Sequence, residues 1–162
     1  TPPKDAQKYF TLLETAITKY GGTLATITGR YFAMDRDTRW QRTKRYYDAL
    51  MDAKGIPALN WKDVLENCYA QDISDEFIPP HVFPGYEGVQ SGDTVIHFNF
   101  RLDRARQVTH ALTDKDFKKF TRKKVSITFA GFQEYYKGMN GKVLFPRPHP
   151  KHVWGKSYQL MA

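Results

Sequence analysis

The sequence is poor in the features that mark secreted and membrane proteins. It has one cysteine, Cys68, so no disulfide framework can form within the chain, which fits a reducing compartment. No apolar run reaches the roughly 18 residues that a membrane-spanning helix needs, and no signal-peptide pattern opens the chain. We therefore expect a cytoplasmic protein without a membrane partner. Because Cys68 lies at an apolar position of a helical pattern, we expect a buried thiol rather than a nucleophile.

The sequence is rich in aromatic residues and in positive charge. The 162 residues suit one domain of ordinary size, and 11 Phe and 10 Tyr can supply its core. A net charge of +8 favours anionic partners, namely phosphorylated metabolites, nucleic acid or an acidic membrane surface, without choosing among them. The sequence does not begin with Met, so we interpret it as a fragment, a processed product or an excised domain.

Apolar periodicity predicts helices and strands that alternate along the chain. A helix begins at Asn60 as its N-cap, and helical spacing also marks the segments 4–20, 37–54 and 101–112. Runs rich in β-branched residues predict strands over 23–29, 94–100 and 125–132, the second of them mostly buried. Strands that alternate with helices indicate an α/β fold of βαβ type, with a sheet covered by helices.

Three segments carry weaker patterns. Residues 72–93 hold three prolines and three glycines and predict a long irregular connection. Residues 114–124 are basic and weakly helical, and from Gly138 onward there is little periodicity. No linker interrupts the sequence, so we expect a single domain over 1–162.

An arginine cluster follows the second predicted strand, in "FNFRLDRAR". The strand ends at Phe100, and a helix begins within one or two residues. Arg101 and Arg104 are three apart and therefore share one face of that helix. Ligands collect at the carboxyl ends of strands in open α/β sheets, and helix N-termini favour anions. Asp103 falls in the first turn, where a carboxylate is favourable and can orient an arginine.

The stretch "GRYFAMDRDTRW" also places arginines where a predicted strand gives way to a helix. Arg30 lies at the carboxyl end of a predicted strand, and Arg36 lies in the turn before the next helix. Arginine suits this task better than lysine, because its planar fork donates two parallel hydrogen bonds to a carboxylate or phosphate and stays charged. These residues predict one binding site for a small dianion, formed by Arg30, Arg36, Arg101 and Arg104. Structural ion pairs with Asp35, Asp37 and Asp103 are the alternative.

The same motifs resemble the cofactor-independent phosphoglycerate mutases, which use no 2,3-bisphosphoglycerate. The likeness rests on "TPPKDAQKYF", "GRYFAMDRDTRW", "SDEFIPP" and "GDTVIHFNFRLDRARQVTHAL", which occur in the family's order and close to its spacing. These motifs cover the first two-thirds of the chain, and after residue 125 the likeness becomes loose. The resemblance implies an isomerase of glycolysis and gluconeogenesis that interconverts 3-phosphoglycerate and 2-phosphoglycerate through a phosphoserine.

The family has two domains, and the resemblance implies which of them this chain represents. One domain is related to alkaline phosphatases and carries a nucleophilic serine and two metal ions, usually manganese. The other is inserted into it and holds the glycerate. Residues 1–162 would be most of this inserted domain, a three-layer α/β fold with a mostly parallel sheet and helices on both faces. Its substrate-binding residues would be Arg30, Arg36, Arg101, Asp103 and Arg104.

Several parts of the family's machinery have no counterpart in this sequence. The D-G-R-D segment before T-P-P, a substrate-binding histidine farther upstream, the serine and every metal ligand are missing. We therefore expect a monomeric fragment that lacks catalytic and metal-binding residues and is inactive alone. Its partners would be the phosphoglycerates and the phosphatase-like domain of the same enzyme, and an edge of its sheet is expected to be missing.

Two other functions fit single features. The run "KKFTRKK", the charge and the aromatic content fit a module that binds nucleic acid by stacking, but no nucleic-acid-binding motif appears. His149 and His152 have a spacing that suits a metal, yet no third ligand stands near them and an exposed tail is the better interpretation. We expect no nucleic-acid partner, and ordinary structural roles for His97 and His110.

Overall fold

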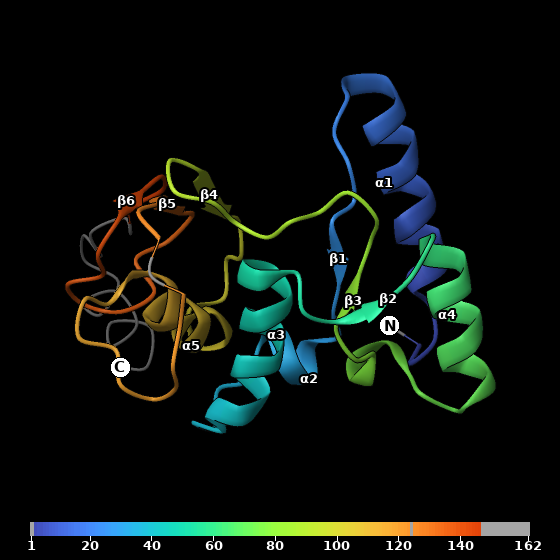
Figure 1. Cartoon of the computed structure of the whole chain (residues 1–162), viewed down its shortest axis with the longest axis horizontal. Helices are drawn as coiled ribbons and strands as arrows, with labels where there is room; N and C mark the ends of the chain where they lie inside the picture. The colour runs from blue at the N-terminus through green and yellow to red at the C-terminus, as the bar shows by residue number, and fades with distance from the viewer. Residues whose placement is uncertain (1, 124, 147–162) are drawn as a thin grey trace, which may run out of the picture.

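The computed structural model describes residues 2–123 and 125–146, so the histidines of the predicted tail lie outside the described residues. Two three-stranded sheets are separated along the long axis of the molecule (Figure 1). The first has the order β1-β3-β2, with β1 at Thr26–Ile27, β2 at Ile56–Pro57 and β3 at His81–Val82. The second has the order β4-β5-β6, with β4 at Thr94–His97, β5 at Thr128–Gly131 and β6 at Lys142–Val143. Only β1 and β3 pair in antiparallel fashion among the described strands, which confirms an α/β fold with mostly parallel pairing.

The helices surround and join these sheets. Their bounds are α1 Ala6–Tyr20, α2 Arg30–Ala33, α3 Trp40–Asp52, α4 Trp61–Ala70, the 3₁₀ helix η1 Asp75–Phe77, and α5 Leu102–Thr113. In Figure 1, α1 and α4 lie beside the first sheet, α5 lies at the second sheet, and α2 and α3 lie between them. The predicted N-cap is confirmed, because the side-chain oxygen of Asn60 accepts a hydrogen bond from the Asp63 N–H at 2.9 Å.

The core is divided into three clusters that follow this arrangement. The first lies between α4 and the first sheet and contains Cys68, which is buried as predicted. Burial raises the pKa of the Cys68 thiol. The second cluster joins α3 to α5 through Tyr47 and Ala111, and the third packs α5 against β5 through Ala105 and Phe129. Helix α5 is therefore held from both sides by apolar contacts.

The prediction of an irregular connection over 72–93 is wrong for η1 and for β3, the middle strand of the first sheet. β3 is two residues long, too short to show a period of two in the sequence. It is placed by long-range backbone hydrogen bonds, such as the one that the Phe83 N–H donates to the Ala25 carbonyl at 3.0 Å. The two-residue strands β2 and β6, the latter within the segment after Gly138, escape prediction for the same reason.

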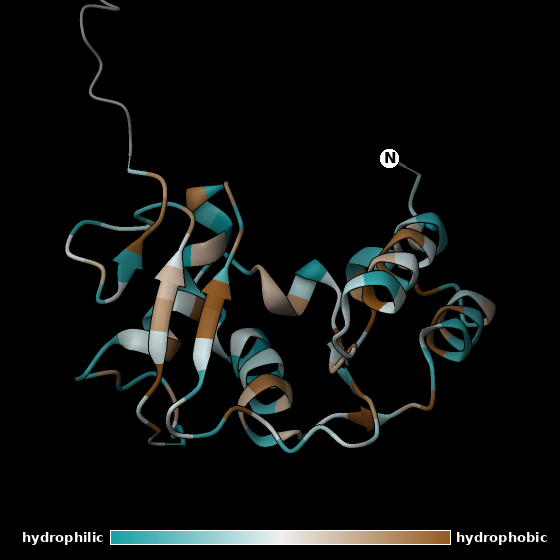
Figure 2. Cartoon of the chain, turned by 90° about the horizontal axis from the view of Figure 1, so that it is seen from above, coloured by the Kyte–Doolittle hydropathy of each residue, from teal (hydrophilic) through white to brown (hydrophobic). Residues whose placement is uncertain are grey.

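The prediction that the strand at 94–100 is mostly buried is also wrong. Ile96 is 58% exposed, and Phe98 and Phe100, directly after β4, are 73% and 63% exposed. Helix α5 covers one face of this sheet, where Val95 packs, so the alternate side chains on the other face of the strand stay exposed. In Figure 2, which colours residues by hydropathy, β4 is the brown, apolar strand of this sheet, whereas β5 is pale.

The weak helix predicted over 114–124 is not formed in its described part, which consists of turns and bends. Two of its basic side chains form hydrogen bonds with other elements. Arg122 donates a hydrogen bond to the Ala111 carbonyl at 2.7 Å, near the end of α5. The Lys123 ammonium donates to the Met51 carbonyl at 3.3 Å, near the end of α3. Both cations therefore satisfy carbonyl groups in the last turns of helices, where positive charge is favourable.

Candidate functional site

The chain passes from β1 into α2 at Gly29, where two backbone segments come unusually close. The Gly29 N–H donates to the Ile78 carbonyl at 2.8 Å, and a Cβ at Gly29 would lie 2.4 Å from the Glu76 carbonyl oxygen. Only glycine permits this approach. It brings Arg30, the first residue of α2, beside the Glu76 side chain, with 2.5 Å between Nη2 and Oε2.

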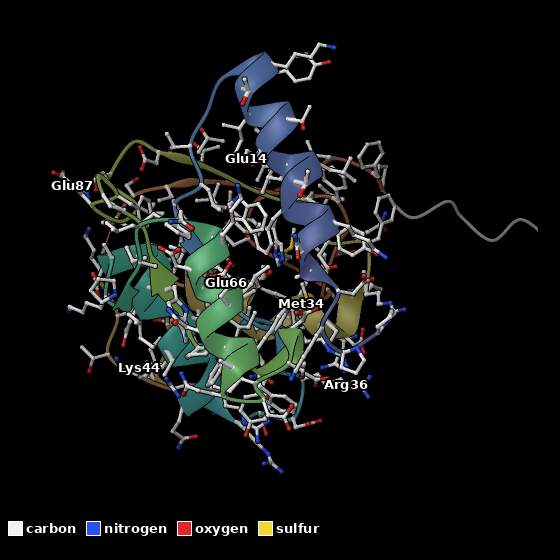
Figure 3. All side chains as sticks on the ribbon, turned by 90° about the vertical axis from the view of Figure 1, so that its right-hand side faces the viewer. Glu14, Met34, Arg36, Lys44, Glu66 and Glu87 are labelled. Carbon is white, nitrogen blue, oxygen red and sulfur yellow. The ribbon has the colours of Figure 1, made fainter. Side chains whose placement is uncertain are left out.

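The loop between α2 and α3 carries Arg36, and Asp35 sets the shape of this loop. Asp35 is 4% exposed, and its Oδ1 accepts hydrogen bonds from the N–H groups of Asp37 and Arg39 at 3.1 and 3.0 Å. Its Oδ2 faces the guanidinium of Arg42 at 3.3 Å. Because Asp35 points inward, Arg36 lies at the outside of the molecule (Figure 3), with 52% of its side chain exposed.

The second arginine motif surrounds the start of α5. Arg101 is the N-cap residue, and its side chain forms no ion pair within the described part of the chain. Asp103, in the first turn, contacts Arg36 of the other motif, with 2.8 Å between Oδ2 and Nη1. Arg104 donates to the Met34 carbonyl at 3.2 Å. The two motifs are therefore in direct contact, although 67 positions separate Arg36 from Asp103.

The ion pairs of this region are exposed and can exchange partners. The hydrogen bond from Arg36 lowers the pKa of the Asp103 carboxyl, and Asp103 raises the pKa of Arg36, so both groups are charged at neutral pH. In the other pair, 51% of the Arg30 side chain and 35% of the Glu76 side chain are exposed. Exposed ion pairs contribute little net free energy, because water solvates the separated charges well. The two pairs therefore add little to the stability of the fold.

Two pockets lie on either side of Glu76, which lines both. The Arg36 pocket has a volume of about 250 Å³ and is lined by Tyr31, Asp35, Arg36, Asp37, Arg42, Glu76, Phe77 and Arg104. The Arg30 pocket has a volume of about 650 Å³ and is lined by Pro2, Pro3, Thr28, Gly29, Arg30, Ser74, Asp75 and Glu76. Arg101 lines neither of them. The structure thus brings three of the four arginines to adjoining pockets, and their common role in anion binding stays a prediction.

Two residues of these pockets were not anticipated as site residues. Glu76 lies in the quoted segment "SDEFIPP", but its contact with Arg30 spans 46 positions and has no local signature. Arg42 occupies an ordinary helix position in the sequence, yet it neutralises Asp35 and stacks on the Tyr31 ring at 3.7 Å. Of the alternative ion pairs with Asp35, Asp37 and Asp103, the structure shows the one between Arg36 and Asp103, whereas Asp35 pairs with Arg42, which was not a predicted site residue.

Part of the basic, aromatic segment that suggested nucleic-acid binding packs against or bonds to the rest of the protein, whereas Lys118 and Lys119 are exposed. The rings of Phe117 and Phe120 contact the Trp40 ring, with centroids 5.4 and 6.5 Å apart, and belong to the cluster between α3 and α5. Arg122 and Lys123 bind backbone carbonyls. These side chains are therefore not presented as a stacking platform for bases.

None of the helices at 2–123 or 125–146 is long and apolar enough to cross a membrane. In the same part of the chain, no group of three or more His, Cys, Asp and Glu side chains is arranged to hold a metal ion.

Comparison with known proteins gives one consistent family. The family model described as "BPG-independent PGAM N-terminus" matches residues 1–137. A 2,3-bisphosphoglycerate-independent phosphoglycerate mutase of Synechococcus sp. (strain JA-3-3Ab) is 43% identical over 159 residues, which cover 96% of this chain and 30% of that protein. The protein of the same name from Moorella thermoacetica is 40% identical over 162 residues, which cover 96% of this chain and 32% of that protein.

A solved structure shows the same likeness. The crystal structure of Leishmania mexicana phosphoglycerate mutase at low cobalt concentration matches with a TM-score of 0.85 at 26% identity, over 99% of this chain and 32% of that one. The chain therefore spans about a third of the length of the proteins that it matches.

Proposed function

This chain belongs to the family of the BPG-independent phosphoglycerate mutase N-terminus, and from this premise we propose that it is the substrate-binding part of an enzyme that interconverts 3-phosphoglycerate and 2-phosphoglycerate. Residues 1–162 would form most of the substrate-binding domain. The family places the rest of the reaction in a phosphatase-like domain outside this chain. The setting that we propose is cytoplasmic, in glycolysis and gluconeogenesis.

The observation that carries this proposal is the meeting of the two arginine motifs at one exposed ion pair. Arg36 and Arg104 line one pocket and Arg30 lines the next, with Glu76 between them. A phosphoglycerate carries a carboxylate and a phosphate, and each can accept paired hydrogen bonds from a guanidinium. Substrate would displace Asp103 from Arg36 and Glu76 from Arg30, exchanging exposed ion pairs for bidentate ones.

In the proposed reaction this chain supplies positioning and charge neutralisation. A serine of the other domain would take the phosphoryl group from one hydroxyl of the glycerate, and the second hydroxyl would take it back. The glycerate must stay bound between these steps, since water would otherwise hydrolyse the phosphoserine. Arginines that remain charged hold the acid, and closure of the two domains excludes water.

In the proposed enzyme, metal ions would bind only to the phosphatase-like domain. The resemblance implies two ions, usually manganese, which would stabilise charge on the transferred group. The described residues of this chain offer no cluster of three metal-binding side chains, so they do not fit a resident metal. We therefore assign the metal ligands to the phosphatase-like domain and derive no step of this chain through them.

The test is arginine replacement in the complete enzyme that carries this segment. Arg30→Ala and Arg101→Ala should each lower phosphoglycerate turnover at least about tenfold, since a hydrogen bond to a charged group contributes about 1.5–3 kcal/mol. Lys118→Ala, which removes an exposed positive charge away from both pockets, is the matched control and should have no effect. Full activity in both arginine variants would refute the assignment. The chain alone should show weak or no binding of 3-phosphoglycerate by calorimetry.

A further inference from the structure

Gln107 is a buried polar residue of α5 that the predicted site does not include. It is 5% exposed and lies three positions after Arg104. Its Oε1 accepts a hydrogen bond from the Thr38 N–H at 2.8 Å, and its Nε2 donates to the Thr43 hydroxyl at 2.9 Å. A backbone N–H can only donate, so it determines which end of the amide faces Thr38. The side chain is therefore held in one orientation, with both ends bonded.

The contact with Thr38 completes the support of the loop that carries Arg36. Asp35 accepts from the N–H groups on either side of Thr38, and Gln107 accepts from Thr38 itself. Thr38 has φ +58°, a left-handed conformation that residues with a Cβ seldom adopt. A strained backbone persists only when its surroundings hold it in place. Of the groups that bond these N–H groups, only Gln107 comes from α5.

Three contacts join α5 to this loop, and they differ in how they would respond to substrate. The Arg36–Asp103 pair is exposed, and the proposed anion displaces it. Arg104 itself lines the Arg36 pocket, so its hydrogen bond to Met34 is also open to competition. The amide of Gln107 is buried and contacts no pocket residue that would bind the anion. It is therefore the contact that can hold the loop on α5 while the arginines change partners.

We propose that Gln107 is a positioning residue, which holds the Arg36 loop in register with α5 so that Arg36 and Arg104 face the same anion. This inference rests on the proposed function, because Gln107 would maintain the distance between Arg36 and Arg104, which are both proposed to bind the substrate. Gln107 does not touch the substrate. It acts through the Thr38 N–H and the loop around it.

The experiment uses the complete enzyme that carries this segment, with steady-state kinetics on 3-phosphoglycerate below the melting temperature of every variant. Gln107→Met preserves length and volume and removes both hydrogen bonds. We expect it to raise KM about tenfold with a much smaller change in kcat, because it weakens a binding contact rather than a step of the chemistry. Gln107→Glu retains an acceptor for Thr38, and the Thr43 hydroxyl can turn to donate, so this variant should restore KM.

Two controls separate positioning from stability. Thr43→Val removes the other partner of Gln107 and leaves the Thr38 contact, so it should lower the melting temperature while KM stays within about twofold. Arg36→Ala tests the premise. If Arg36→Ala changes neither KM nor kcat, the proposed function is wrong. If Arg36→Ala raises KM and folded Gln107→Met does not, the function stands and the role of Gln107 is refuted.

A second variant covers the case in which Gln107→Met does not fold. Gln107→Asn keeps both polar groups but is one methylene too short to reach Thr38 and Thr43 together. It should raise KM in the same direction. An unchanged KM in folded Gln107→Asn overturns the proposal equally.

Discussion

Replacing Gly29 with alanine tests the close approach on which the Arg30 pocket depends. The backbone at Gly29 has φ −65° and ψ 152°, which alanine adopts without strain. The obstacle is the neighbouring segment. The new Cβ would lie 2.4 Å from the Glu76 carbonyl oxygen and 2.7 Å from both the Glu76 carbonyl carbon and the Ile78 nitrogen. These are backbone atoms, so no side-chain rotation can relieve the overlap.

The magnitude follows from two opposing effects. Gly→Ala at a compatible backbone position stabilises a protein by about 0.4–1 kcal/mol, because the unfolded chain loses conformational freedom. Inserting a methyl group into a filled space typically costs about 1–3 kcal/mol, and separating the two segments also weakens the Gly29–Ile78 hydrogen bond, at about 0.5–1.5 kcal/mol. We therefore expect Gly29→Ala to lower the free energy of unfolding by about 0.5–4 kcal/mol.

The assay is urea denaturation of the 162-residue chain, followed by circular dichroism. Gly85→Ala is the matched control, because no atom lies within 4 Å of its new Cβ and only its φ of +82° opposes the change. It should cost about 1–2 kcal/mol from the left-handed backbone alone. A Gly29→Ala variant as stable as the parent, or more stable, would refute the steric reasoning. Without a steric overlap, only the stabilising effect on the unfolded chain would remain.

Three further predictions concern the elements around the site. Asn60→Ala should lower the free energy of unfolding by about 0.5–2 kcal/mol in urea denaturation, because the Asp63 N–H loses its cap, whereas Asn60→Asp should retain most of it. Tyr135→Phe should cost about 1–3 kcal/mol, because its buried hydroxyl lies 2.6 Å from the His97 carbonyl and 2.8 Å from the Asn99 carbonyl and donates its one proton to them. Burial lowers the pKa of His97 from 6.5 to about 4, so the unfolded chain binds the proton more readily between these pH values. His97 therefore contributes full stability above pH 6.5, and up to about 3 kcal/mol is lost as the pH falls towards 4; urea midpoints at pH 7 and pH 5 measure the loss.

Each of these predictions has a contradicting outcome. Equal stability of the Asn60 variants Ala and Asp would show that the cap contributes nothing. A Tyr135→Phe midpoint equal to that of the parent would mean that water replaces the lost hydroxyl. For the histidine, His97→Phe should reduce the difference between the two pH values. An unchanged difference would assign the pH dependence to other groups.

Local chemistry accounts for the features that were predicted correctly. The N-cap at Asn60, the helix that follows Phe100 and the burial of Cys68 each depend on residues within a few positions of one another. Turn and capping preferences and helical spacing act over that range. The strands β2, β3 and β6 are two residues long, so their formation depends on the partner strand rather than on their own pattern.

The sequence by itself therefore determined the α/β class, the helices α1, α3, α4 and α5, and the positions of the two arginine motifs at strand-to-helix junctions. Only the tertiary structure decided how these motifs meet. Glu76 reaches Arg30 across 46 positions, Asp103 reaches Arg36 across 67, and Gln107 reaches Thr38 across 69. Side chains so far apart in the chain meet only in the packed domain. Local preferences therefore cannot encode which carboxylate or amide each arginine motif will contact, because packing of the whole domain selects it.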